Sequence, residues 1–153
     1  ELVLAAYEDF HPRMAEVADR FFAESWIDAA LAEGKRGGAF SHGAVPSAHP
    51  YVLLNYTGTT RDVQTLAHEL GHGLHFYETI ENQSVLHLMP PLFLAETAST
   101  LNEYLLAESL MAESESPEAC RSLPEARAGP PGAGLRGVWR EALRPLGSRG
   151  PGR

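Results

Sequence analysis

The sequence contains a single cysteine, Cys120, in 153 residues. An internal disulfide and a cysteine-rich zinc finger are therefore excluded, and the cysteine content is compatible with a reducing compartment. No apolar run approaches the roughly 20 residues that cross a bilayer, so we expect no transmembrane helix and no membrane partner. The chain begins at Glu1 without a basic and then apolar leader. We therefore expect no signal peptide, and a chain that begins inside a longer sequence.

Basic residues are also scarce, and the net charge of −8 argues against a nucleic-acid partner. The hydrophobic fraction of 44% is typical of a globular domain. Charge divides the chain into two parts, since residues 1–116 hold 5 Lys and Arg against 17 Asp and Glu, whereas residues 117–153 hold 7 Arg, 3 Glu, 6 Pro and 7 Gly. We expect a folded domain at 1–116 and a disordered Pro-, Gly- and Arg-rich tail at 117–153.

Hydrophobic periodicity predicts a mainly α-helical domain that begins with a helical segment at about 2–25. Pro12 either interrupts this segment or begins a second helix. Two stretches rich in β-formers and bounded by Gly and Pro predict short paired strands at 37–42 and 51–56.

Two long helices are expected in the second half of the domain. The first should cover about 61–78, with Thr59 or Thr60 as its N-cap. The second should cover about 92–113, because apolar residues recur there at helical spacing.

The segment 68–72, His-Glu-Leu-Gly-His, lies in the first long helix. Residues four apart in an α-helix differ by about 40° around the axis, so His68 and His72 face the same way and can converge on one ion. Imidazole nitrogen suits Zn²⁺. Glu69 can reach a water beside that ion without binding it, which is the arrangement that metal-assisted peptide hydrolysis requires. The alternative is a pair of ordinary histidines in the core or at the surface.

A catalytic zinc ion usually takes three protein ligands. Glu96, on the second long helix, is the expected third ligand. Glu103 lies seven residues further along almost the same helix face, and we expect it to accept a hydrogen bond from a ligand histidine; the alternative is a solvated carboxylate. Glu78 and Glu81 are rival third ligands, but they follow His72 too closely to return easily to the metal.

His75 is expected beside the metal ligands or in the cleft wall, with a simple packing role as the alternative. Gly71 and Gly73 each cost about 1 kcal/mol relative to Ala inside a helix. We therefore expect another backbone to approach this helix closely. No catalytic or ligand role is expected for the remaining candidates, which are His42, His49, His87 and Cys120.

Residues 68–75 (His-Glu-Leu-Gly-His-Gly-Leu-His) and 96–103 (Glu-Thr-Ala-Ser-Thr-Leu-Asn-Glu) resemble motifs of a known family. The family is the oligoendopeptidase F branch of the thimet-oligopeptidase-like (M3) zinc metallopeptidases. Stretches at 26–28, 34–41 and 49–63 fit the same branch, so the resemblance covers about 20–110.

The resemblance implies a zincin-like catalytic core in which two long helices carry the metal site and a short β-hairpin lies beside it. It implies one Zn²⁺ held by His68, His72 and Glu96, with Glu69 as the general base of a zinc-activated water. The implied activity is that of a metalloendopeptidase that cleaves short oligopeptides in the cytoplasm. Residues 1–116 would then be a partial metallopeptidase catalytic domain.

Departures from the family leave other functions open. Family members are several times longer, and beyond the third ligand they carry His and Tyr residues that act on the reacting carbonyl, whereas 117–153 contains neither residue type. We therefore expect the central piece of a peptidase, with a zinc-binding remnant without turnover, in a structural or interaction role, as the alternative. A further alternative is another zincin with the same helix motif, in which a different helix carries the third ligand. The strand at 51–56 is either a buried strand or the partner of an extended peptide substrate.

Overall fold

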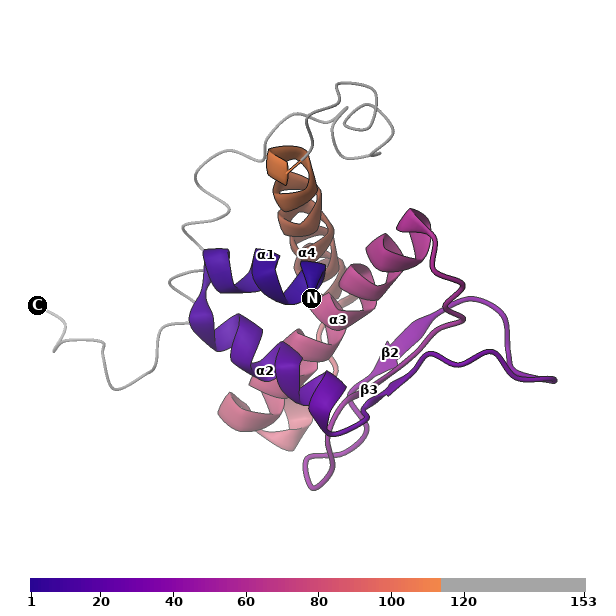
Figure 1. Ribbon diagram of the computed structural model, residues 1–153. Coiled ribbons are helices and arrows are strands. Elements are labelled where there is room, and N and C mark those ends of the chain that lie inside the picture. Colours follow the sequence, from indigo (N-terminus) through magenta and orange to yellow (C-terminus); the bar gives the residue numbers. More distant parts are fainter. Residues whose placement is uncertain (114–153) are drawn as a thin grey trace, which may run out of the picture.

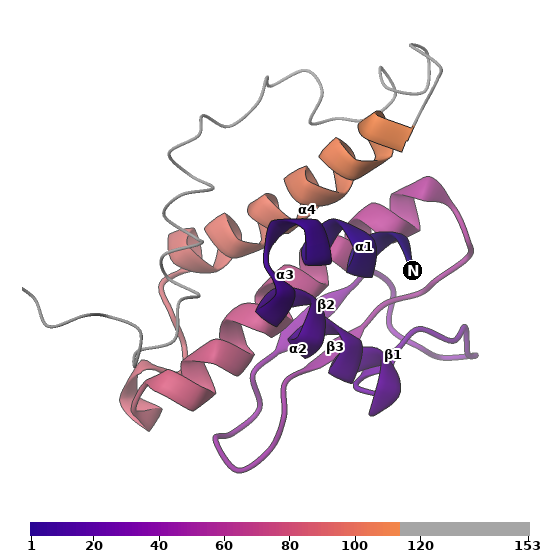
Figure 2. The same cartoon turned by 60° about the vertical axis from the view of Figure 1, so that its left-hand side comes forward.

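The structure is a computed structural model that describes residues 1–113, and the predicted tail at 117–153 lies outside the described residues. Its elements are α1 (Leu2–Phe10), α2 (Pro12–Ala23), β1 (Ile27–Asp28), β2 (Phe40–His42), β3 (Tyr51–Leu53), α3 (Thr60–Asn82), the 3-10 helix η1 (Val85–His87) and α4 (Leu92–Glu113). The long helices α3 and α4 lie side by side, α1 contacts α2 and α4, and the sheet packs on α3 (Figures 1 and 2). The predicted mainly helical core with a small β element is confirmed.

A proline separates the first two helices. Pro12 occupies the first turn of α2, where its missing N–H costs no helical hydrogen bond. The His11 side chain accepts a hydrogen bond from the Arg13 N–H at 3.2 Å and caps the helix. Tyr7 of α1 and Phe21 of α2 are both fully buried in the shared core. Of the two expectations for Pro12, the start of a second helix is confirmed.

The sheet has the strand order β1-β3-β2. β2 and β3 form the predicted antiparallel hairpin, although both strands are shorter than predicted, and β1, which was not predicted, pairs in parallel with β3. Because β3 has a neighbour on each side, a peptide substrate has no free edge of β3 to pair with. That expectation for 51–56 is wrong, and burial of Val52 and Leu54 agrees with the alternative of a buried strand.

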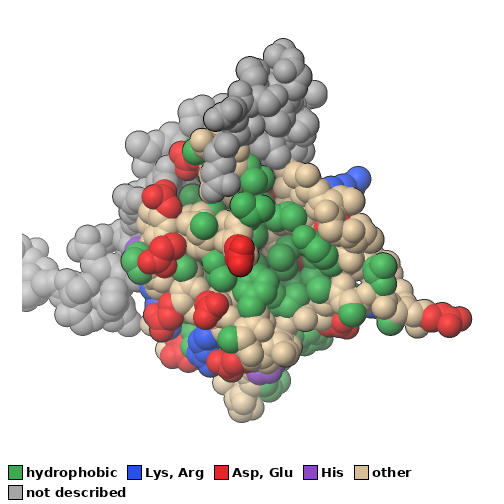
Figure 3. Space-filling view, in the orientation of Figure 1, with side chains coloured by type: hydrophobic (Ala, Val, Ile, Leu, Met, Phe, Trp, Pro, Cys, Tyr) green, Lys and Arg blue, Asp and Glu red, His purple; other side chains and the backbone are tan. Residues whose placement is uncertain are grey.

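Acidic side chains dominate the outer surface of α1 and α2, where Glu8, Glu16 and Asp19 are exposed. Figure 3 shows acidic side chains beside a central area of hydrophobic side chains on this face of the molecule. Exposed apolar residues also occur between α3 and the first turn of α4, where Leu86 and Leu92 are 87% and 74% exposed. Among the described helices, none combines the length and apolar character needed to cross a bilayer.

A capping box begins α3. The Thr59 side chain accepts a hydrogen bond from the Asp62 N–H, and the Asp62 carboxylate accepts one from the Thr59 N–H. This reciprocal pair satisfies two N–H groups of the first turn and places a negative charge at the positive end of the helix dipole. The N-cap is therefore Thr59. The helix continues to Asn82, beyond the predicted end at about 78, whereas α4 has its predicted bounds.

The two long helices approach one another closely at Gly71. A Cβ atom at this position would lie 2.7 Å from the Cα of Ser99 and 2.9 Å from the carbonyl oxygen of Ala98. The expected approach of another backbone is thus confirmed at Gly71. Gly73 differs, because a Cβ there would lie 2.8 Å from the side chain of Phe21 rather than against backbone.

Gly71→Ala should lower the stability of the 153-residue chain. Alanine gains about 1 kcal/mol of helix propensity, but overpacking costs about 1–3 kcal/mol, and the backbone of α4 cannot rotate away from the new methyl group. We expect a net loss of about 1 kcal/mol in the free energy of unfolding, measured by urea titration. Gly73→Ala should lose less because the Phe21 ring can shift, and Gly37→Ala, with open space around it, is the control. A Gly71→Ala chain as stable as the wild type would contradict the packing argument.

Asp62→Asn should weaken the acid dependence of stability. Hydrogen bonds from the Thr57 hydroxyl and from the backbone N–H groups of Thr59 and Thr57 hold the pKa of the Asp62 carboxyl well below its usual value. Because the pKa is lower in the folded than in the unfolded state, the carboxylate stabilises the fold above about pH 4, and this contribution is lost as the pH falls further. The Asn variant should therefore be less stable at pH 7 and should lose less stability between about pH 4 and pH 2. Thermal unfolding across this range tests the point, and a constant difference between the two proteins at every pH would refute it.

Candidate metal centre

His68 and His72 lie one turn apart on the side of α3 that faces α4. Their Nε2 atoms are 3.2 Å apart, and their ring planes are nearly perpendicular, at 83°. The four-residue spacing thus brings both imidazoles to one point, as helix geometry requires. Both side chains are largely screened from solvent, with exposed fractions of 29% and 14%.

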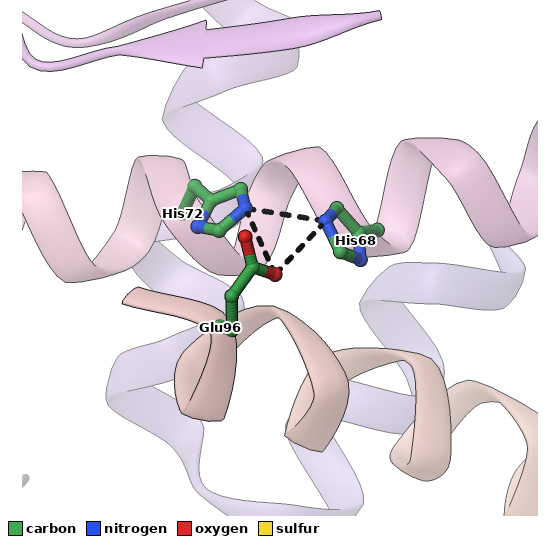
Figure 4. A group of neighbouring side chains, drawn as sticks. All are labelled: His68, His72 and Glu96. Carbon is green, nitrogen blue, oxygen red and sulfur yellow. Dashed lines mark hydrogen bonds and ion pairs between the residues drawn. The ribbon is translucent and has the colours of Figure 1, made fainter. Parts of the chain in front are cut away.

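Glu96 reaches the same point from the second turn of α4 (Figure 4). Its Oε2 atom lies 3.6 Å from Nε2 of His68 and 3.8 Å from Nε2 of His72. These three side chains form a potential metal-binding group, with all ligand atoms within 4.8 Å of one another. Two ligands of a tetrahedral zinc with bonds of about 2.0–2.1 Å lie about 3.3 Å apart. The observed spacings are close to that value, so this donor set fits a zinc ion after small side-chain movements.

The other side of each imidazole is also held by α4. His68 Nδ1 is hydrogen-bonded to Oε1 of Glu103. His72 makes a hydrogen bond to the backbone of Ala95. Such contacts fix the tautomer and the ring orientation of a ligand histidine and leave Nε2 directed to the metal. Glu103 therefore lies where the sequence prediction places it, whereas the contact of Ala95 involves only backbone and has no sequence signal.

Ser99 is a buried polar residue that the sequence analysis does not single out. Its hydroxyl lies 3.0 Å from Oε2 of Glu96 and is completely shielded from solvent. Its position, three residues after Glu96 on one helix, is the available signal, since residues i and i+3 share a helix face.

Glu69 is buried beside the metal-binding group, with 8% of its surface exposed, but it is not one of the three clustered residues. Burial is the main cause that raises the pKa of its carboxyl above the usual value, and the charges of Glu96 and Glu103 raise this pKa further. A positive charge on His68 and a backbone hydrogen bond from Ser41 lower it. Ser41 belongs to β2, so the hairpin reaches the carboxylate. A carboxyl with a raised pKa beside a metal-binding group is suited to accept and return a proton.

The two clustered histidines have opposite electrostatic environments. The hydrogen bond to Glu103 raises the pKa of His68, against the opposing effect of burial. Burial, followed by the charge of His68, lowers the pKa of His72. His72 is therefore held as the neutral imidazole, which is the form that binds a metal.

The structure separates the rival ligands from this group. Glu78 pairs with Arg13 of α2 at 3.3 Å, and Glu81 is exposed in the last turn of α3. His75 is half-buried one turn beyond His72, and burial lowers its pKa. None of the three joins the clustered residues in the described part of the chain.

The remaining histidines lie elsewhere. His42 is exposed on β2, and His49 stacks on Trp26 with 4.3 Å between ring centroids. His87 is exposed in η1. Cys120 lies outside the described residues.

The sequence profile of peptidase family M3 matches residues 4–127, a wider range than the motifs recognised at about 20–110. Among curated relatives, the chromosomal oligoendopeptidase F of Lactococcus lactis subsp. cremoris is 43% identical over 112 residues, which are 73% of this chain and 18% of that protein. The group B oligopeptidase PepB of Streptococcus agalactiae is 42% identical over 113 residues, 74% of this chain and 18% of that protein.

Solved structures share the fold. A crystal structure of a protein from Chlamydophila abortus superposes with a TM-score of 0.75 at 35% identity, over 90% of this chain and 22% of that one. PZ peptidase A, solved with an inhibitor, superposes with a TM-score of 0.65 at 24% identity over 72% of this chain and 20% of that one, which indicates the fold alone. The chain spans about a fifth of the length of the relatives it matches. The resemblance seen in the sequence motifs is confirmed: the chain belongs to peptidase family M3.

Proposed function

We propose that this chain carries the catalytic centre of a zinc metalloendopeptidase that hydrolyses short oligopeptides. The observation that carries the proposal is the convergence of His68, His72 and Glu96 beside the buried carboxyl of Glu69. Two neutral nitrogens and one carboxylate oxygen are the donor set of many catalytic zinc sites, in which a fourth position is left for water or substrate.

When bound, zinc would supply a Lewis acid that lowers the pKa of a water molecule and polarises the scissile carbonyl. Glu69 removes a proton from that water as the oxygen atom of the water bonds to the carbonyl carbon. The same carboxyl then returns the proton to the peptide nitrogen as the C–N bond breaks. Burial raises the pKa of this carboxyl, which makes it a stronger proton acceptor than an exposed glutamate.

The other side chains fix the geometry of this reaction. Glu103 holds His68 through Nδ1, so the Nε2 atom of His68 faces Glu96.

The sheet limits how a peptide can pair with the protein. Because β3 is enclosed by β1 and β2, strand pairing between the protein and an extended peptide is restricted to the outer strands.

The substrate class in this proposal comes from relatives whose names are oligoendopeptidase F and group B oligopeptidase. We propose short peptides as substrates of this chain too, with cleavage in the cytoplasm. A single cysteine in the whole sequence is in keeping with a reducing compartment.

The second candidate is a metal-binding protein without turnover. It rests on the same group of His68, His72 and Glu96, which can bind a metal whether or not a peptide is cleaved beside it. Metal binding and peptide hydrolysis must therefore be measured separately.

Zn²⁺ should bind the 153-residue chain with one-to-one stoichiometry. Glu96→Ala should weaken binding by at least about tenfold, because it removes a ligand, and the affinity should fall on acidification as the imidazoles become protonated. Competition with a chromophoric chelator measures both effects. Glu81→Ala, which removes an exposed carboxylate from α3, is the matched control and should bind like the wild type. Equal affinity of the Glu96→Ala chain would point to a different third ligand.

Glu69→Gln should abolish peptide hydrolysis and keep zinc binding. The amide has nearly the same shape but cannot accept the proton, and loss of general-base catalysis costs about 10²- to 10⁴-fold in rate. A quenched fluorescent oligopeptide, with and without chelator, provides the measurement. Equal rates for the two chains would rule out the proposed mechanism, whereas stoichiometric zinc with no turnover in either chain would favour the second candidate.

A further inference from the structure

We propose that Ser99 is a positioning residue that holds the Glu96 carboxylate in its ligand orientation, an inference that rests on the proposed metal centre. The Ser99 hydroxyl lies 3.0 Å from Oε2 of Glu96. This is the oxygen atom that lies 3.6 Å and 3.8 Å from the Nε2 atoms of the two histidines. One carboxylate oxygen therefore has the serine hydroxyl on one side and both imidazoles on the other.

Glu96 needs such a contact because packing alone does not fix it. Its side chain is 47% exposed, and a glutamate side chain has three rotatable bonds that lose freedom when it binds. Ser99, in contrast, is completely buried. Its Cα would lie 2.7 Å from a Cβ placed on Gly71, so the residue sits directly against the metal-bearing helix. A hydroxyl anchored at this contact can restrict the carboxylate.

The alternative role of Ser99 is an ordinary contact within α4, because its hydroxyl also lies 3.0 Å from the backbone oxygen of Glu96. Helical serine and threonine residues often donate to a preceding carbonyl in this way. Thr97 shows that behaviour on its own, with its hydroxyl 2.6 Å from the carbonyl oxygen of Phe93. Ser99 differs because a carboxylate lies at the same distance as the carbonyl, and a hydrogen bond to an ionised acceptor is the stronger of the two.

The first test compares Zn²⁺ affinity by chelator competition, without reference to activity. Ser99→Ala removes only the hydroxyl and keeps a small residue against Gly71. We expect its Zn²⁺ dissociation constant to rise by about 10- to 100-fold, the usual effect of losing a partner of a metal ligand. Thr97→Val, which removes a hydroxyl from the same helix, should leave the affinity within about twofold of the wild type, since its partner is only a backbone carbonyl. An unchanged affinity in Ser99→Ala would overturn the proposal.

A double-mutant cycle separates positioning from a general structural role. In a Glu96→Ala background, Ser99→Ala should have no further effect on Zn²⁺ affinity, because the carboxylate through which Ser99 acts is gone. An equal loss in both backgrounds would overturn the proposal. Co²⁺ substituted for Zn²⁺ adds a spectroscopic signature, since the visible absorption should shift in Ser99→Ala and stay unchanged in Thr97→Val.

Ser99→Gly also removes the hydroxyl and adds no atom at the contact with Gly71, and it replaces Ser99→Ala if that chain loses its helical circular dichroism. Its Zn²⁺ affinity should fall by about the 10- to 100-fold expected for Ser99→Ala, and wild-type affinity would overturn the proposal. The same measurements distinguish failure of this inference from failure of the proposed function. Zn²⁺ affinity that is insensitive to Glu96→Ala would contradict the proposed metal centre. Affinity that is sensitive to Glu96→Ala and insensitive to the Ser99 variants would contradict only the role of Ser99.

Discussion

The close contact between α3 and α4 at Gly71 is the constraint on which the metal-binding group depends. Packed helices normally lie about 8–10 Å apart, at a distance set by the side chains between them. Here a glycine on α3 meets the backbone of α4 at Ser99. The closeness allows a glutamate side chain from α4 to reach two imidazoles on α3. A larger residue at this contact would displace the third ligand along with the helix that carries it.

The α4 helix provides one prospective ligand and also orients the two imidazoles that α3 provides. It supplies Glu96 to the group, Glu103 to His68 and the backbone of Ala95 to His72. Movement of α4 would therefore alter all three prospective ligands together. The two imidazoles are also electrically unequal, because an acidic partner favours the charged form of His68 while burial favours the neutral form of His72. The charge on His68 lowers the pKa of His72, so a proton on one imidazole disfavours a proton on the other.

Sequence patterns predict those features that depend on short-range geometry. The four-residue spacing of His68 and His72 predicts that both imidazoles lie on one helix face, and the apolar periodicity predicts a helix at 92–113. The structure has both features. Glu96 was predicted from its place on the next long helix, and the family resemblance implies the same residue; spacing on one helix alone does not say where another helix packs. β1 was missed because it has two residues and is held by backbone hydrogen bonds, such as that from the Val52 N–H to the Trp26 carbonyl, which carry no side-chain pattern.

The charges of the site favour a divalent cation independently of its shape. Glu69, Glu96 and Glu103 bring three carboxylates around two imidazoles, and the other two carboxylates raise the pKa of Glu69. Even with His68 protonated, the group has more negative than positive charge. A cation with two positive charges at the convergence point would offset this excess and attract the charged form of Glu69. Its charge would thus oppose the effect of burial, and the pKa of Glu69 would be lower beside the cation than the surrounding protein alone makes it. Burial and metal charge therefore act in opposite directions on one carboxyl, and their balance sets the pH range in which it can serve as a base.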